Sequence, residues 1–96
     1  MSQSLLALES FLALSEAMAG AAEAQEWEEL VRVGEERGTL LAHLPADLDV
    51  QLPAAEQAQA RLIIERCQQL DERTCLLVEE RQKALRILLR EPKPVT

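Results

Sequence analysis

AAEQAQARLIIERCQQLDERTCLLVEERQKALRILLRE, residues 54–91, contains neither glycine nor proline. Strong helix formers fill this stretch, which predicts a single helix about 57 Å long at about 1.5 Å per residue. In a chain of 96 residues, such a helix needs other helices alongside it to cover its apolar side. The sequence therefore predicts an all-α protein, an antiparallel three-helix bundle or hairpin with a long third helix. This slender shape suits gripping a partner better than enclosing a reaction.

The chain has room for one small domain, and proline and small residues divide it. The expected elements are a helix over about 3–22, a helix over about 26–44, a loop over 45–53, a helix over about 54–91 and a disordered tail over 92–96. Pro45 ends the second helix, and Pro53 suits the first turn of the third. Ser2 or Ser4 can cap the first helix. We thus expect one helical domain over residues 1–96.

Apolar residues recur at steps of three and four along each expected helix, as on the buried face of a helix. In the first helix these are Leu5, Leu8, Leu12, Ser15, Ala19 and Ala22. In the second they are Trp27, Leu30, Val31, Gly34, Gly38, Leu41 and Leu44. In the third, Ile63, Leu70, Leu77, Ala84 and Leu88 cluster within about 60° of one another. Gly34 and Gly38 form a small-xxx-small pair that favours close helix contact.

Charge and composition exclude several classes of function. The net charge of −7 disfavours binding to nucleic acid. Residues 1–60 hold two basic residues against eleven acidic ones, whereas residues 61–96 hold eight against six, a pattern that could steer a partner. Glu9 and Glu16 interrupt the apolar N-terminal run, and we expect neither a signal peptide nor a membrane-spanning segment. Cys67 and Cys75 lie about 12 Å apart along one helix, too far for an internal disulfide. These features predict a cytoplasmic protein.

The chain offers no equipment for catalysis. His43 is the only histidine, and no partner positioned for acid–base chemistry accompanies it. Asp47 and Asp49 lack the ligand number of a calcium loop, and no cysteine spacing suits zinc. We expect no enzyme activity, no metal and no cofactor.

Apolar side chains left over on the third helix predict a surface for a partner helix. The candidate partner-binding residues are Leu62, Leu76, Val78, Leu85, Ile87 and Leu88. The alternative is that they belong to the core or to a self-association interface, such as that of a homodimer. Trp27, at the start of the second helix, is either a core anchor or a binding hot spot.

Several segments together resemble one family. They are Leu14-Ser15-Glu16 followed by small residues, Glu26-Trp27-Glu28-Glu29-Leu30, Glu36-Arg37 with Leu40-Leu41, and, in the third helix, Leu70-Asp71, Leu77, Arg81 and Leu85. Their order and spacing resemble the flagellar export chaperones of the FliT type over roughly residues 10–90. The chain departs from that pattern at Gln25 and Glu26, where the family commonly has a glycine.

The resemblance implies a small cytoplasmic helical-bundle chaperone for flagellar type III export. Such a chaperone binds the C-terminal helical segment of the filament-cap protein and prevents premature assembly. Some members also bind the export ATPase complex, or the flagellar transcription regulator as an anti-activator. A short fourth helix masks the binding surface in some members; none follows residue 91 here, and we expect an open third helix. The alternatives are a self-assembling structural coiled-coil protein and a regulatory adaptor.

Overall fold

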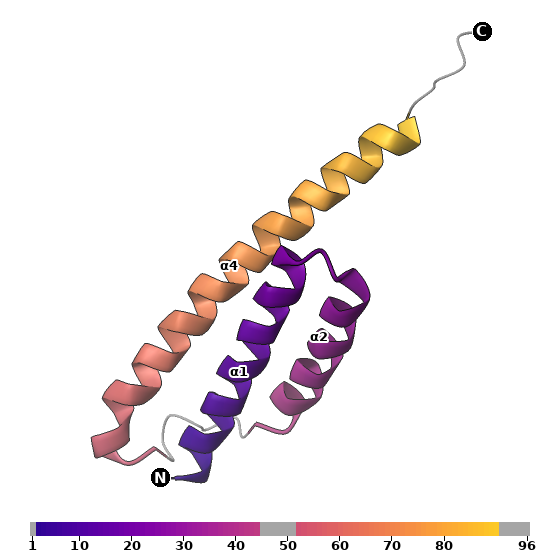
Figure 1. Cartoon of the computed structure of the whole chain (residues 1–96). Coiled ribbons are helices and arrows are strands. Elements are labelled where there is room, and N and C mark those ends of the chain that lie inside the picture. The colour runs from indigo at the N-terminus through magenta and orange to yellow at the C-terminus, as the bar shows by residue number, and fades with distance from the viewer. Residues whose placement is uncertain (1, 45–51, 91–96) are drawn as a thin grey trace, which may run out of the picture.

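The computed structural model describes residues 2–44 and 52–90, which form three helices and no strand. The helices are α1 (Gln3–Glu23), α2 (Trp27–Ala42) and α4 (Ala54–Arg90) (Figure 1). The molecule measures 67 × 22 × 21 Å, so α4 extends along nearly its whole length. This confirms the predicted all-α class with a long third helix. The disordered tail over 92–96 and most of the loop over 45–53 lie outside the described residues.

Helix α1 is the central element, because it packs against both α4 and α2. At one end the Ser2 hydroxyl donates to the Glu56 carboxylate, over 2.5 Å. Near the other end the Arg73 guanidinium donates to the Glu23 carboxylate, over 2.7 Å. These pairs show that α1 and α4 run in the same direction, while α2 returns between them in the chain (Figure 1).

The first turn of α1 is fixed from two sides. Ser2 is its N-cap, and the Ser2 Oγ accepts a hydrogen bond of 3.1 Å from the Leu5 backbone amide. The Glu56 carboxylate accepts from the Ser2 hydroxyl and also from the Ser2 amide, at 3.2 Å. Hydrogen bonding from the Ser2 hydroxyl holds the pKa of Glu56 below its ordinary value. The cap therefore also aligns the starts of α1 and α4.

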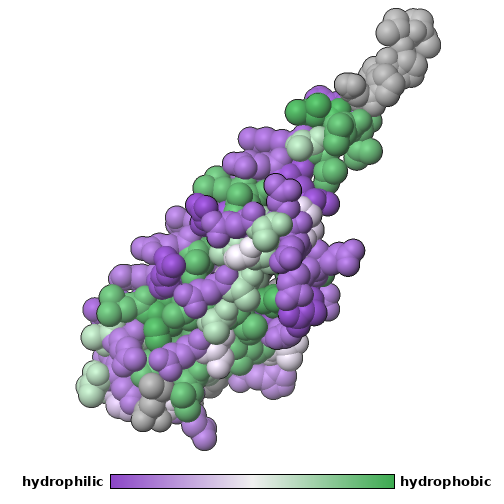
Figure 2. Space-filling model, in the orientation of Figure 1, coloured by the Kyte–Doolittle hydropathy of each residue, from purple (hydrophilic) through white to green (hydrophobic). Residues whose placement is uncertain are grey.

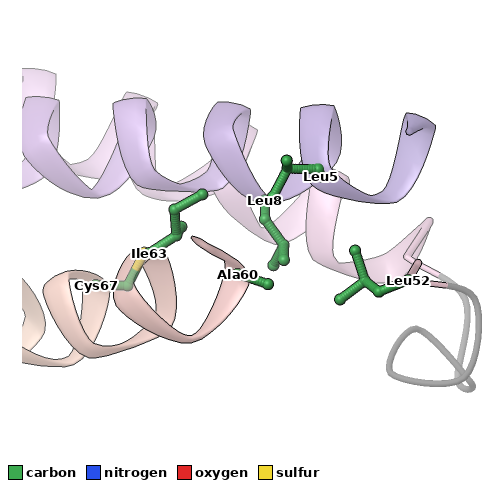
Figure 3. Packing of buried hydrophobic residues seen from close by; sticks show 6 residues of the cluster. All are labelled: Leu5, Leu8, Leu52, Ala60, Ile63 and Cys67. Carbon is green, nitrogen blue, oxygen red and sulfur yellow. The ribbon is translucent and has the colours of Figure 1, made fainter. Parts of the chain in front are cut away.

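The core is aliphatic and consists of two clusters along α1. The lower cluster contains Leu5, Leu8, Leu52, Ala60, Ile63 and Cys67, and Figure 3 shows the α1 leucines pointing toward α4. The upper cluster contains Ala21, Ala22 and Leu30, with Met18, Trp27, Leu77 and Val78 packed around it. Small alanines on α1 allow the helix axes to approach closely there. The predicted stripe of α1 is confirmed at Leu5, Leu8, Ser15, Ala19 and Ala22, which are buried, and its remaining member Leu12 is partly buried.

The predicted stripe of α2 is wrong at three positions, since Val31, Gly38 and Leu41 are exposed. Val31 and Leu41 are more than half exposed, whereas Val33 is buried and was missed. The buried face contains Leu30 and Val33 and continues to the partly buried Arg37. Because Arg37 is charged, the pattern of apolar residues does not indicate which face of the helix is buried. Because α2 packs mainly against one helix, α1, only a narrow arc of its surface has to be apolar.

Only one of the two glycines of α2 lies close to a neighbouring helix. A Cβ at Gly34 would lie 3.6 Å from the Met18 Cε, in ordinary contact, whereas nothing lies within 4 Å of one at Gly38. Close helix contact is therefore confined to Gly34.

Helix α1 is long and apolar enough to cross a membrane by length and composition, contrary to the expectation from the sequence. The reason lies in its packing position. A helix that touches neighbours on two sides needs a wide apolar arc, and this arc raises its mean hydropathy. The same composition thus describes a central core helix.

Helix α1 ends in a Schellman motif whose left-handed residue is Gln25. Gln25 has φ 61°, the Glu26 amide donates to the Ala21 carbonyl over 2.8 Å, and the Gln25 amide donates to the Ala22 carbonyl over 3.1 Å. Glycine adopts this backbone conformation without steric cost, whereas other residues do not. The turn therefore forms despite the missing glycine, through its two hydrogen bonds.

We predict that Gln25→Gly raises the free energy of unfolding by about 1 kcal/mol, because it removes the left-handed strain. Urea denaturation measures the change. The matched control is Gln69→Gly, an exposed position within α4, where glycine should instead cost about 1 kcal/mol. Equal destabilisation by both substitutions would contradict the assigned turn geometry.

One polar group joins all three helices inside the bundle. Ser15 on α1 is fully buried, and its hydroxyl donates to the Phe11 carbonyl over 2.9 Å. The Arg37 guanidinium of α2 donates to the Ser15 Oγ at 3.0 Å and to the Asp71 carboxylate of α4 at 2.6 Å. The same guanidinium lies 4.9 Å from the centroid of the Phe11 ring. Arg37 therefore links α2 to α4 across α1.

We predict that Arg37→Ala lowers the free energy of unfolding by about 1–2 kcal/mol, because Ser15 and Asp71 then lose a charged donor at a partly buried site. Arg32→Ala is the control, since Arg32 forms only exposed ion pairs with Glu29 and Glu36 on its own helix. Urea denaturation should detect a loss for the first variant and none for the second. Equal stability of the two variants would contradict the linking role of Arg37.

Candidate partner-binding site

The outer end of α4 has no neighbouring helix among the described residues. Glu23, the last residue of α1, pairs with Arg73, so α4 continues for 17 residues beyond this point. Every residue from 79 to 90 is exposed. Figure 1 shows this end projecting past the turn between α1 and α2, and Figure 2 shows hydrophobic side chains gathered on it. We call residues 79–90 the tip.

The face of α4 that packs on α1 continues unbroken onto the tip. Along α4, steps of three and four connect Ala60, Ile63, Cys67, Leu70, Thr74, Leu77, Arg81, Ala84 and Leu88. The first five are buried, Leu77 is partly buried, and the last three are exposed. A strict alternation of this kind is the packing pattern of a coiled-coil seam. The tip therefore carries a helix-packing face on which no helix lies.

A shallow pocket lies where this face leaves α1. Its volume is about 350 Å³, and its walls come from the end of α1, the start of α2 and α4. The lining includes Ala22, Trp27, Leu77, Arg81, Ala84 and Leu85. We call this pocket the junction. Because three helices contribute walls, the junction is the best-enclosed part of the exposed face.

Trp27 packs in the core and also lines the junction, while its role as a binding hot spot stays a prediction. Its ring packs against the upper core cluster, and the side chain is partly buried. Its other face carries the Arg81 guanidinium, 4.6 Å from the ring centroid, a cation–π contact. Trp27 thus anchors the core and also forms a wall of the pocket.

The six predicted binding residues occupy two different faces of α4. Leu85 and Leu88 are exposed on the tip, and Val78 lies partly buried beside the junction. At about 100° per residue, the other three, Leu62, Leu76 and Ile87, lie roughly 100° round the helix from Leu88. They are exposed but widely spaced, about 21 Å from Leu62 to Leu76. The structure thus brings together Val78, Leu85 and Leu88. Ile87 belongs to the tip but lies on the other face of α4.

Two further residues belong to this surface. Leu89 is the most exposed large apolar residue of those described, at 83%, and it flanks Leu85 on the tip. Arg81 interrupts the apolar repeat, and only its contact with Trp27 reveals that it lines the junction. The alternation of three- and four-residue steps from Ala60 to Leu88 includes Arg81, and it was the signal that could have shown that Arg81 belongs to this surface.

The tip is basic, whereas the turn beside it is acidic. Arg81, Lys83, Arg86 and Arg90 outnumber Glu79 and Glu80 within residues 79–90. Beyond Trp27, a second shallow depression is lined by Glu26, Glu28 and Glu29 together with Arg81. The two ends of the exposed face therefore differ in charge.

Among the described residues, no group of His, Cys, Asp and Glu side chains could hold a metal ion. His43 is exposed at the end of α2, with its Nδ1 2.7 Å from the Thr39 carbonyl oxygen. No acidic or nucleophilic side chain contacts it among the hydrogen bonds of the described residues.

The chain matches the family model described as flagellar protein FliT over residues 5–93. The chain belongs to the FliT family. Membership implies a role in flagellar export as a chaperone, not as an enzyme. Comparisons with curated proteins and with solved structures gave no match. The family match includes α2, the tip of α4 and all but the first two residues of α1.

The two cysteines of this FliT-family chain should differ sharply in reactivity. Cys67 is buried in the lower cluster, and burial raises the pKa of its thiol, whereas Cys75 is exposed. Because the thiolate is the reactive form, Ellman's reagent should modify one thiol promptly and the second only after denaturant is added. Cys75→Ser should abolish the prompt reaction; its persistence would contradict the burial of Cys67.

Proposed function

We propose that this FliT-family protein is a cytoplasmic flagellar type III export chaperone that binds the C-terminal helical segment of the filament-cap protein. Binding would keep that segment from assembling before export. The observation that carries the proposal is the uncovered packing face of α4, which ends in Leu85, Leu88 and Leu89. Family membership supplies the export role, and the exposed face supplies a surface for a helix.

The surface suits reversible holding. Full burial of an aliphatic side chain contributes about 1.5–3 kcal/mol, and a partner helix could cover only a few such residues here. Part of this gain offsets the loss of translational and rotational freedom on association. We therefore expect a dissociation constant in the micromolar range, about 1–50 μM. Such an affinity lets a client be captured and then released to the export apparatus.

Two other functions use the same surface. A self-assembling coiled-coil protein would cover the tip with a second copy, and a regulatory adaptor would cover it with the export ATPase complex or a flagellar transcription regulator. Continuity of the α4 repeat favours a helical occupant in each case. The export chaperone is preferred because the family match points to flagellar export.

The direct test is isothermal titration calorimetry of the protein with a peptide of the C-terminal helical segment of its cognate filament-cap protein. We predict that Leu85→Glu/Leu88→Glu weakens binding about tenfold or more, because both residues are anchors of the tip. The matched control is Leu62→Glu/Leu76→Glu, two exposed leucines on the other face of α4. The control should bind like the unmodified chain.

Circular dichroism of both variants should match that of the unmodified chain, since all four leucines are exposed. Lack of any heat signal from the unmodified chain at tens of micromolar peptide would reject the cap-protein client. A stable oligomer whose formation depends on Leu85 and Leu88 would instead favour the self-assembling alternative.

A further inference from the structure

We infer that the client helix lies end to end with α1 along the tip of α4, runs parallel to α4, and carries acidic groups at its C-terminal end. This inference rests on the proposed chaperone function and specifies the chemistry and direction of its client. Three features of the structure carry it: the unfilled part of the seam, the position of the junction, and the opposite charges at the two ends of the exposed face.

The seam determines where the helix lies. Helix α1 covers the repeat of α4 as far as Leu77, and Arg81, Ala84 and Leu88 are the next positions of that repeat. A helix placed there continues the line of α1 and meets the same face of α4. From Leu77 to Arg90 the rise is about 20 Å, enough for about three and a half turns of a partner helix.

The junction determines how the near end is anchored. Ala84 presents only a methyl group to the seam, so a large partner side chain has room between Trp27 and Leu85. Residues at the centre of an interface and enclosed on several sides usually contribute most to binding. We therefore place the main apolar anchor of the client in the junction, beside the end of α1.

The charges determine the direction. The junction end lies beside Glu26 and Glu28, and the far end of the tip carries Arg86 and Arg90. A helix presents partial positive charge at its N-terminus and partial negative charge at its C-terminus. The client N-terminus therefore fits the acidic junction. Its C-terminal end, including a terminal carboxylate if the segment is the end of the cap protein, fits the basic tip.

Photo-cross-linking tests the position and direction with the cap-protein peptide as probe. One peptide carries benzoylphenylalanine near its N-terminus, and a second carries it near its C-terminus. The first should attach to residues 22–28 or to Arg81, and the second to residues 86–90, as mapped by mass spectrometry. Reversed attachment, or attachment centred on residues 57–76, would overturn the inference.

A charge-reversal pair tests the electrostatic part. Arg86→Glu/Arg90→Glu should weaken peptide binding about three- to tenfold at low salt, with a smaller loss at high salt. The matched control is Arg61→Glu/Arg66→Glu, which changes the same charge on exposed positions of α4 outside the tip and should have little effect. Equal losses for the two pairs would indicate a general effect of net charge and would overturn the assigned direction.

Failure of this inference is distinguishable from failure of the proposed function. If the unmodified chain does not bind the peptide, the cap-protein client itself is rejected. If the peptide binds but attaches elsewhere, only the end-to-end arrangement is rejected. If sedimentation shows that a second copy of the chain already covers the tip at the concentrations used, the arrangement is likewise rejected.

Discussion

The structure depends on the difference in length between two parallel helices, α1 and α4, that pack against each other. Helices α1 and α4 start together at the Ser2–Glu56 contact. Helix α1 ends at Glu23, which pairs with Arg73 of α4, and α4 continues for 17 residues beyond Arg73. Because the same face of α4 continues, the packing that stabilises the bundle also creates an exposed apolar surface. The stable body and the proposed binding surface are thus two parts of one seam, in which α1 covers the first part.

The central position of α1 follows from the same constraint. It contacts both other helices, whereas α2 and α4 meet mainly through side chains such as Arg37 with Asp71 and Trp27 with Arg81. Polar contacts at these two levels set the position of α2 on α1, since an aliphatic core alone is tolerant of sliding. The second of these contacts also forms a wall of the junction, so the packing of α2 shapes the proposed binding surface.

Much of this fold could be predicted from the sequence, because its determinants are local and periodic. The uninterrupted stretch after Pro53 and the alternating leucines of α1 specify the helices and the buried face of α1. The phase of α2 could not be predicted, because Arg37 occupies a buried-face position through contacts with Ser15 and Asp71 that lie far away in the sequence. The extent of the proposed binding surface could not be predicted either, because periodicity alone does not say where α1 stops covering α4. The helical wheel already separates Leu88 from Leu62 and Leu76, but only the three-dimensional arrangement shows that Leu88 lies beyond the end of α1.

The unsupported tip has a consequence for release. Residues 79–90 are held in helical form mainly by backbone hydrogen bonds and intrinsic propensity, and the contact of Arg81 with Trp27 lies near their start. Helical segments of about three turns are only marginally stable in water on their own, and here the rest of α4 supplies the nucleus. Fraying of these last turns would disrupt the exposed apolar face of the tip, while the two core clusters would stay intact. A pulling force on a bound segment could therefore peel it away at little energetic cost, and the chaperone would be ready for another round without refolding.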